Sequence, residues 1–509
     1  MKRALTLALV LALAACSRGR PEGTAIVVGL INSPVNLDPR VGSDEASQKA
    51  HQLLYNTLVR IDKDLNVVPE LAESFGAEGN TTYVARLRQG VLFHNGRELS
   101  AEDVVYTFRS FLDPTFRGRS GAYRLLKSVN ARDRYTVEFN LSEPFASFPV
   151  NLVMGIVQAG SGAANARSPI GTGPYRAVSF VQDDRLVLEP FDRYWQGRPK
   201  NDGVVLKVVP DDTMRGLELR KGTVDIVVND LSPDIIAQLR EEGRLGIAEA
   251  PGSDYAYIGV NLRDPVLQNL KVRQAIGYAI DREAIVRHLR RGFATVAVGI
   301  LPPMSWAFER QVFDFSYDPA RARQLLDEAG FRDPDGDGPQ PRFRVSLKTS
   351  TSEIYRVQAA ALQHDLARVG IAVDVKSSEL QTLFADVLRG AFQLYTLQWV
   401  GVTDPDMLRR VYHSTQKPPA GLNRVHYENP EVDRLIGEAA LAPDQDTRRA
   451  LYARAQRLIA DDVPYISLWY KRNVAVFQPE LSGVTLSPIA DFTFLKDVSR
   501  SNAIAGAAH

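Results

Sequence analysis

The 509-residue sequence contains a single cysteine, Cys16, which excludes any disulfide bond within the chain. It also lacks a charge excess, because 61 lysines and arginines stand against 60 aspartates and glutamates. Proteins that bind nucleic acids normally show a basic excess, so a nucleic-acid partner is not expected. The chain is too long for one compact core, and two or three lobes are predicted.

Long apolar runs are also scarce, and the one that stands out is Ala4 to Ala15, directly after Lys2 and Arg3. This run is shorter than the ~20 residues that a membrane-spanning helix needs. A short apolar stretch behind a positive N-terminus is typical of a signal peptide. We therefore expect a mature protein outside the cytoplasm that does not span the membrane.

The apolar run ends in Leu13-Ala14-Ala15-Cys16, which resembles the bacterial lipobox. In that motif the cysteine is lipidated and becomes the new N-terminus. We predict that residues 1–16 are a lipoprotein signal peptide, that residues 17–23 are a flexible tether, and that Cys16 anchors the protein to a bacterial membrane. An ordinary secretory signal with an incidental cysteine is the alternative.

Familiar catalytic and metal-binding motifs are missing as well. The sequence has no Gly-x-Ser-x-Gly elbow, P-loop, His-Glu-x-x-His or Gly-x-Gly-x-x-Gly motif, and its seven histidines lack metal-ligand spacing. We expect no enzyme activity, no cofactor and no metal site. Two alternatives stay open, namely a metallophore held near His413 and His426, and a hydrolase whose paired carboxylates the sequence does not reveal.

Local patterns predict alternating strands and helices. Residues 25–30 form an apolar run typical of a buried strand, and residues 47–59 have a helical pattern. Ser100 and Asp103 have the spacing of a capping box at the start of a helix. The β-like run 392–398 ends in a loop, Trp399 to Asp406, that carries an aromatic ring and acidic groups. Loops at strand ends commonly carry binding groups.

Several sequence motifs follow one another along the chain, namely Leu58–Asp62, Val68–Ser74, Arg86–Gly96, Ser100–Phe108, Ile170–Tyr175, Tyr194–Gly197, Val272–Arg282 and Asn429–Asp433. Together they resemble the family 5 extracellular solute-binding proteins. These proteins are the oligopeptide-, dipeptide- and nickel-binding components of ABC importers. The resemblance covers nearly all of the mature chain.

The resemblance implies an α/β type II periplasmic-binding-protein fold, in which two lobes joined by a hinge close over a ligand. It places lobe I at residues 24–60, 173–260 and 464–500, an inserted subdomain at 61–172, and lobe II at 261–463. The hinge is expected near residues 257–261 and 464–465.

The resemblance also suggests which side chains line the ligand cleft. Peptide-binding members carry an aspartate three residues after the tryptophan, which pairs with the peptide ammonium, but this chain has Val402 there. Asp404 is the nearest acid, and an arginine near the position of Arg356 can meet a ligand carboxylate in dipeptide binders. The predicted ligand-binding residues are Asn32, Ser33, Tyr255, Tyr257, Arg356, Trp399 and Asp404.

These expectations point to a monomeric lipoprotein that captures a small peptide-like solute and passes it to the membrane subunits of an ABC permease. A nickel–metallophore, opine or sugar-like ligand is the alternative within the family. Other classes that stay open are an extracellular hydrolase and a chaperone-like or signalling lipoprotein.

Overall fold

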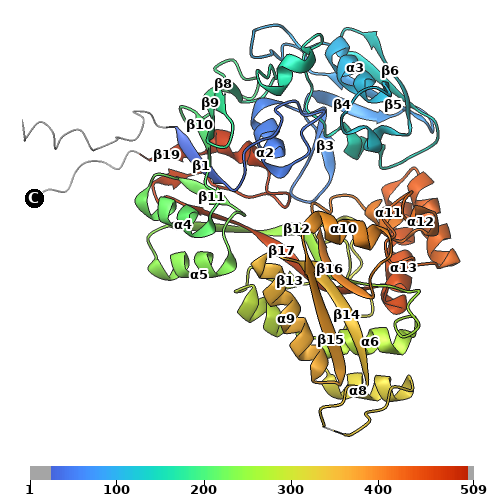
Figure 1. The fold of residues 1–509 in the computed structure, drawn as a ribbon. Helices are drawn as coiled ribbons and strands as arrows, with labels where there is room; N and C mark the ends of the chain where they lie inside the picture. Colours follow the sequence, from blue (N-terminus) through green and yellow to red (C-terminus); the bar gives the residue numbers. More distant parts are fainter. Residues whose placement is uncertain (1–24, 337, 502–509) are drawn as a thin grey trace, which may run out of the picture.

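The computed structural model describes residues 25–336 and 338–501. The predicted signal peptide, the tether and Cys16 therefore lie outside the described residues. A mixed eleven-stranded sheet runs through the molecule in the order β15-β14-β16-β12-β17-β11-β1-β10-β9-β8, and β13 pairs with β17 (Figure 1). These strands are β1 Ile26–Leu30, β8 Tyr175–Val181, β9 Arg185–Pro190, β10 Val204–Val208, β11 Ile226–Val228, β12 Gly246–Val260, β13 Ala294–Val296, β14 Phe343–Ser350, β15 Ile371–Ser378, β16 Leu394–Trp399 and β17 Tyr465–Phe477.

The antiparallel strands β12 and β17, here called the crossing strands, connect the two halves of this sheet. Residues 246–251 of β12 pair with the end of β17 that lies beside β11. Residues 255–260, which include most of the expected hinge, pair instead with both β17 and β16. The pairing shifts register between Pro251 and Tyr255, and that irregularity separates the two halves.

The strand directions bring two sets of strand ends together at the crossing strands. In the first half, β1 is parallel to β10 and β11, and Val228 at the end of β11 pairs with Ala475 of β17. In the second half, β14 is parallel to β15 and β16, and Trp399 at the end of β16 pairs with Tyr255 of β12. The carboxyl ends of both sets therefore face the middle of the crossing strands. Ligands of open α/β sheets bind outside such ends.

Helices cover both faces of the second half. Side chains of the crossing strands point alternately to the two faces, so they enter two separate cores. Ile258 and Trp469 enter one core, whereas Tyr257 and Tyr470 enter the other. The helices and helical turns of the first core are α6 Leu270–Ala279, α7 Arg282–Ala284, η5 Ile285–Leu289, α8 Pro319–Glu328 and α9 Glu353–Ala367. Those of the second are α10 Leu380–Leu388, α11 Met407–Tyr412, α12 Pro430–Leu441 and α13 Gln445–Asp462.

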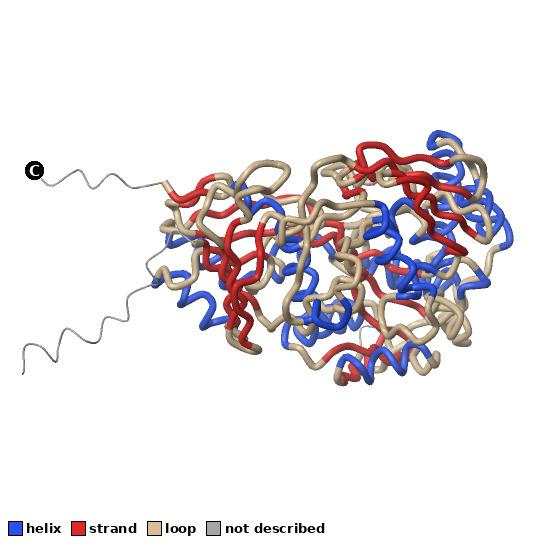
Figure 2. The backbone as a smooth tube through the Cα atoms, turned by 90° about the horizontal axis from the view of Figure 1, so that it is seen from above, coloured by secondary structure: helices blue, strands red, loops and turns tan. Residues whose placement is uncertain are grey.

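A separate four-stranded sheet with its own core lies in the segment predicted to be an inserted subdomain. Its strands β4 Ala72–Ala77, β5 Thr82–Leu87, β6 Leu126–Asp133 and β7 Thr136–Leu141 pack against α3 Ala101–Arg109. Seen from above, this strand-rich region and that of β8–β10 lie at opposite sides of the molecule, with loops between them (Figure 2). Ser100 and Asp103 form the predicted capping box of α3.

The predicted helix over residues 47–59 is too long, because α2 Glu45–Leu54 ends five residues earlier. The chain around Gly171 and Gly173 passes directly against its last turn, and the Gly173 N–H donates to the Leu54 carbonyl at 3.0 Å. A Cβ on Gly171 would lie 2.0 Å from that same oxygen, so a side chain does not fit there. Val59 begins a new strand, β2 Val59–Ile61, which pairs with β3 Val67–Pro69.

The remaining helices of the first half are α4 Asp212–Lys221 and α5 Pro233–Glu242, which lie near the crossing strands (Figure 1). Within residues 25–336 and 338–501, the structure has no helix whose length and apolar character would let it cross a membrane.

Candidate ligand-binding site between the two halves of the sheet

The loop after β1 is held in place by hydrogen bonds to α2. The Ser47 hydroxyl accepts from the backbone N–H groups of Val35 and Asn36 at 2.9 and 3.1 Å, and it donates to Asp44 at 2.6 Å. Ser47 is fully buried, so these contacts are shielded from water. They fix the path of the segment that carries Asn32 and Ser33.

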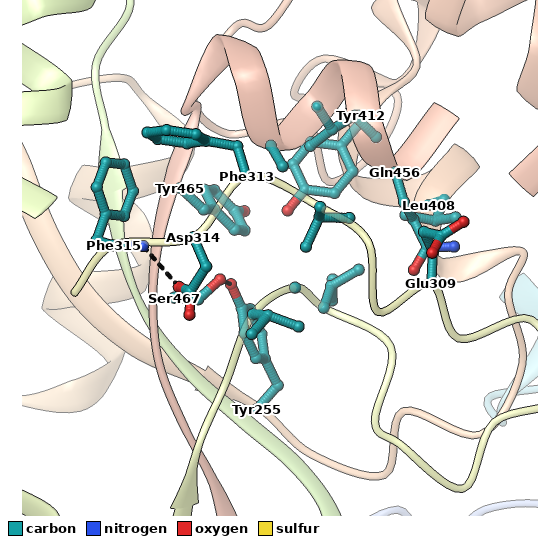
Figure 3. A pocket seen from close by; sticks show the side chains of 16 residues that line it. Tyr255, Glu309, Phe313, Asp314, Phe315, Leu408, Tyr412, Gln456, Tyr465 and Ser467 are labelled. Carbon is teal, nitrogen blue, oxygen red and sulfur yellow. Dashed lines mark hydrogen bonds between the residues drawn. The ribbon is translucent and has the colours of Figure 1, made fainter. Parts of the chain in front are cut away.

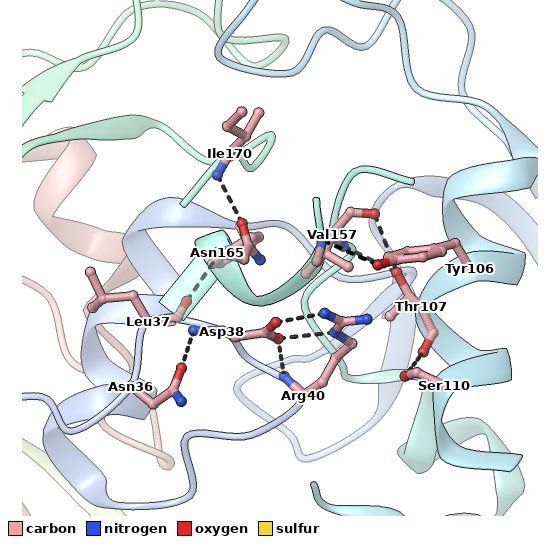
Figure 4. Close-up of polar contacts among 12 residues, drawn as sticks. Asn36, Leu37, Asp38, Arg40, Tyr106, Thr107, Ser110, Val157, Asn165 and Ile170 are labelled. Atoms are coloured by element: carbon pink, nitrogen blue, oxygen red, sulfur yellow. Dashed lines mark hydrogen bonds and ion pairs between the residues drawn. The ribbon is translucent and has the colours of Figure 1, made fainter. Parts of the chain in front are cut away.

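A buried ion pair between Asp38 and Arg40 stiffens the other end of this loop, and Arg40 also packs against the four-stranded domain (Figure 4). Arg40 donates to Asp38 through Nε and Nη2 at 3.0 and 2.6 Å, and its guanidinium lies 5.2 Å from the ring centroid of Tyr106 on α3. Burial lowers the pKa of Arg40, but Asp38 more than offsets this effect, so the pKa is raised overall. The charge pair fixes the Arg40 guanidinium within the loop, and its contact with the Tyr106 ring joins the loop to the domain.

Asn32 and Ser33 differ in exposure. Asn32 is exposed, whereas Ser33 is only 6% exposed. In the described part of the chain, the Ser33 Oγ has no hydrogen-bond partner. A buried hydroxyl without a partner costs free energy, so it is available to a ligand or a water molecule. The role predicted for these two residues stays a prediction that this geometry permits.

Tyr255, Tyr257 and Trp399 come together in one aromatic stack. The rings of Tyr255 and Tyr257 are 5.6 Å apart with an interplanar angle of 8°, and Tyr257 and Trp399 are 6.1 Å apart at 9°. The Arg424 guanidinium lies 4.4 Å from the ring centroid of Trp399, a cation–π distance. The stack is a stiff support beneath the end of β16.

Both tyrosines are completely buried in this structure. The Tyr255 hydroxyl bonds Ser467 at 2.7 Å and lines a small cavity of about 40 Å³ inside the second half (Figure 3). The Tyr257 hydroxyl meets that of Tyr395 at 3.5 Å. Direct contact of these two residues with a ligand stays a prediction, and the geometry favours a supporting role beneath Trp399.

The loop after Trp399 turns toward the crossing strands. Trp399 is 9% exposed and its Nε1 has no partner among the described residues, whereas the next side chain, Val400, is 74% exposed. Gly401 adopts a positive φ of 65°, and its N–H donates to Asp254 at 2.9 Å. The Val402 N–H donates to the Ser253 carbonyl at 3.0 Å, and its side chain is 2% exposed. Val402 is therefore a core residue that offers no charge to a ligand.

Asp404 accepts a hydrogen bond from the Asp406 N–H at 2.8 Å in the turn before α11. Burial, together with the charge of Asp406, raises the pKa of Asp404 to about 6 despite nearby Ser147 and Arg448. Ser147 belongs to the four-stranded domain, so Asp404 faces the contact between that domain and the second half. Its predicted contact with the ligand stays untested by this geometry.

Arg356 lies in the first turn of α9, beyond the carboxyl end of β14, and is exposed. Among the described residues, its guanidinium has no hydrogen-bond or ion-pair partner. Its place at the meeting point of the strand ends agrees with the predicted role, which stays a prediction.

A charge cluster at the crossing strands escaped the sequence analysis. Lys49 bonds Glu45 at 3.0 Å and Asp230 at 3.3 Å. Burial raises the pKa of Asp254 and lowers that of Lys471. The charge of Lys471 partly offsets the shift of Asp254, and the charge of Asp254 partly offsets the shift of Lys471. These groups come from positions up to 426 residues apart in the chain, between Glu45 and Lys471, so no local pattern could link them. The one local signal was Asp254 beside two aromatic residues at a strand bend.

Five exposed large apolar side chains lie in segments that follow strands of the two halves. Their positions in the chain place them beyond the ends of these strands, where they can contribute apolar contacts to a ligand. They follow β1, β14, β15 and β16 and comprise Ile31, Val35, Val357, Leu380 and Val400.

No group of three or more His, Cys, Asp or Glu side chains that could hold a metal ion occurs among the described residues. The His413 ring lies 3.6 Å from Asp433 and bonds the nearby Thr415 at 3.0 Å. The site therefore offers aromatic, apolar and charged groups as its means of recognition.

Comparison with known proteins agrees with this geometry. The model of the bacterial extracellular solute-binding proteins, family 5 Middle, matches residues 66–419. The chain is 32% identical over 500 residues to the oligopeptide-binding protein AppA of Bacillus subtilis, covering 93% of this chain and 91% of AppA. It is also 29% identical over 539 residues to heme-binding protein A of Haemophilus influenzae, covering 96% and 97% of the two chains.

A solved structure shows the same similarity. The structure of B. subtilis AppA in complex with a nonapeptide superposes with a TM-score of 0.77 at 30% sequence identity, covering 95% of this chain and all of that chain.

Proposed function

Because the chain belongs to family 5 of the bacterial extracellular solute-binding proteins, we propose that it captures a peptide or peptide-like solute between the two halves of its sheet. The family and the type II periplasmic-binding-protein fold, both expected from the sequence, are confirmed. We further propose that the protein delivers its solute to the membrane subunits of an ABC importer.

One observation carries this proposal. The carboxyl ends of two sets of parallel strands face each other across the crossing strands, and exposed apolar side chains and charges of both signs surround them. A solute that contacts both halves stabilises the closed form, because closure is favoured by its differential affinity for the two states. Peptides combine apolar side chains with charged ends, which suits this mixture.

The missing acid at Val402 restricts how such a solute is held. A buried ammonium without a carboxylate partner costs several kcal/mol. We assign the role of ammonium partner to Asp404. It lies two residues after Val402 in the same loop and faces the four-stranded domain. Trp399 supplies a wall, and its unpartnered Nε1 supplies a donor.

A ligand panel read by thermal unfolding tests the proposal. A solute at 100 times its Kd adds about 2.7 kcal/mol to the free energy of unfolding, which is a clear rise in Tm. We expect tripeptides with free amino ends to raise the Tm. Asp404→Asn should weaken the binding of these tripeptides more than it weakens the binding of their N-acetylated forms. The matched control is Asp461→Asn, an exposed acid of α13.

Two results would reject parts of the proposal. A Tm rise with haem or a nickel complex and none with any peptide would remove the peptide assignment. Equal affinity of the wild type and Asp404→Asn for peptides with free amino ends would remove Asp404 from the site.

Membrane anchoring through a lipid on Cys16 is part of the same proposal. The sequence around Cys16 supports it, and a protein held at the membrane surface is well placed to meet a permease. Cells grown with labelled palmitate should label the wild type in the membrane fraction. Cys16→Ser should lose the label, and a labelled Cys16→Ser protein would refute the assignment.

A further inference from the structure

A second cavity of about 170 Å³ lies between the two halves, on the face of the crossing strands opposite the aromatic stack. Ala256, Trp469 and Lys471 line it, and they alternate along their strands with Tyr255 and Tyr470 of the other face. The start of α5 closes it from the first half, and the start of α9 closes it from the second. A single water needs about 10–15 Å³ by this measure, so the cavity has room for an organic group of several atoms.

Two cationic side chains line this cavity without a bonded counter-ion. The Arg290 side chain is 9% exposed, its Nε has no partner, and its guanidinium lies 5.7 Å from the ring centroid of Trp469. In the part of the chain that the structure describes, no hydrogen bond or ion pair joins either the Arg290 guanidinium or the Lys471 ammonium to another residue. A buried cation in this condition costs several kcal/mol, unlike an exposed one.

The acids near the cavity are engaged with other groups. Both Asp254 oxygens accept hydrogen bonds, one from the Gly401 N–H at 2.9 Å and the other from the Gln398 amide at 3.0 Å. Asp230 is paired with Lys49. The third cation of the cavity, Arg472, is already paired with Glu249 at 2.9 Å. Arg290 and Lys471 therefore line the interior space without a bonded acid, although the charge of nearby Asp254 partly offsets the lowered pKa of Lys471.

We propose that this cavity is an anion subsite, in which Arg290 and Lys471 receive a side-chain carboxylate of the captured solute. The proposal rests on the proposed function, and it names the solute class as acidic peptide-like compounds. A planar guanidinium presents paired donors that match a carboxylate, and the ammonium adds a point charge. The Tyr355 side chain also lines the cavity and can donate to the same group.

This assignment accounts for the cost of the buried Arg290 guanidinium and of the half-buried Lys471 ammonium, which both line the cavity. In the unliganded protein they oppose folding, and an entering carboxylate offsets their desolvation. Because the start of α5 lines the cavity from the first half and the start of α9 lines it from the second, a solute that fills the cavity contacts both halves and favours the closed form.

A matched pair of tripeptides, Ala-Glu-Ala and Ala-Gln-Ala, tests the proposal by calorimetric titration of the full-length protein. The two peptides differ in one side-chain carboxylate. When such a carboxylate meets a buried cation, it lowers the Kd about tenfold or more. We expect Ala-Glu-Ala to bind at least about tenfold more tightly. Arg290→Gln and Lys471→Gln should each remove most of this preference. The exposed Arg310→Gln is the matched control and should keep it.

Glutarate, a dicarboxylate without a peptide bond, separates this inference from the proposed function. If neither peptide binds but glutarate raises the Tm of the wild type and not of Arg290→Gln, the anion subsite is supported and the peptide assignment fails. If both peptides bind equally, the anion subsite is refuted and the peptide assignment stands. If none of the three binds, the anion subsite is refuted as well.

The folding of the variants is checked by circular dichroism and unliganded Tm. Removing a buried cation should leave the Tm unchanged or raise it. If Arg290→Gln and Lys471→Gln both unfold, Arg290→Lys and Lys471→Arg keep the charge, and each must keep a preference for Ala-Glu-Ala.

Discussion

Ser47 shows how one buried hydroxyl positions the loop that carries Asn32 and Ser33. Its Oγ accepts from two backbone N–H groups, those of Val35 and Asn36. Ser47→Ala leaves both donors without this partner, so we expect a loss of about 2 kcal/mol in the free energy of unfolding and a weaker affinity for the solute. Urea unfolding measures the first effect.

The exposed Ser168→Ala is the control for Ser47→Ala and should change the stability by less than about 0.5 kcal/mol. Equal effects of the two substitutions would show that the Ser47 contacts do not hold the loop.

Asp404 makes the stability depend on pH. Its pKa in the folded protein is about 6, above the ordinary value of 3.8. Between these two values the folded state binds more protons than the unfolded state, so stability falls as the pH rises from about 4 to 6. We expect Asp404→Asn to be about 1–3 kcal/mol more stable than the wild type at pH 7, with the difference vanishing near pH 4.

Urea unfolding at pH 4, 5, 6 and 7 gives this difference for Asp404→Asn and for the control Asp461→Asn. A difference that stays constant over this pH range would contradict the raised pKa of Asp404.

Among the elements, the loop after β16 depends on a left-handed residue. Gly401 has a φ of 65°, and a Cβ there would meet nothing within 4 Å. A side chain at this position is therefore disfavoured by the left-handed backbone conformation and not by a steric clash with neighbouring residues. Gly401→Ala should cost about 1–2 kcal/mol and weaken solute binding, because the loop must change its path beside Trp399.

Gly437→Ala is a matched control inside helix α12, where a Cβ also meets nothing within 4 Å. Alanine is the better helix former, so we expect this variant to gain about 0.5–1 kcal/mol. Thermal unfolding of both variants measures the contrast, and a gain for Gly401→Ala would show that the loop tolerates another conformation.

Elements set by local chemistry could be predicted from the sequence. Ser100 and Asp103 form the capping box that their spacing predicted at the start of α3. The end of α2 could not be predicted, because it is set by the contact with Gly171 and Gly173, more than a hundred residues away in the chain. Tertiary contact overrode the local helical pattern there.

The loop after Trp399 and the cavity around Arg290 differ in the same way in how far the sequence predicts them. The loop after Trp399 was visible as a strand end that carries an aromatic ring and acids. Lys471 and Arg290 line the same cavity because of the pairing of β12, β16 and β17 and the course of the chain after α7. Only the folded structure reveals this arrangement.

On the scale of the whole molecule, the four-stranded domain touches α12 and α13 across the ligand site. The Ala146 N–H donates to the Ala440 carbonyl at 2.9 Å, and Arg448 donates to the Ser147 hydroxyl at 2.8 Å. The Arg409 guanidinium lies 5.4 Å from the ring centroid of Phe145. These contacts link two parts of the molecule that are otherwise joined through the crossing strands.

We expect Ser147→Ala to weaken solute binding by about two- to tenfold, since this contact stabilises the closed form and its loss lowers the closed population. Solute titrations give the Kd, and small-angle X-ray scattering gives the radius of gyration. The exposed Ser142→Ala is the control. An unchanged Kd for Ser147→Ala would show that the contact does not contribute to closure.

Native mass spectrometry of the purified protein shows directly whether it captures a peptide-like solute. A solute held between two closed halves survives gentle purification. We expect an added mass that is released on unfolding and fragments as a peptide bearing at least one acidic side chain. Recovery of haem, a nickel complex or a sugar in its place would contradict it.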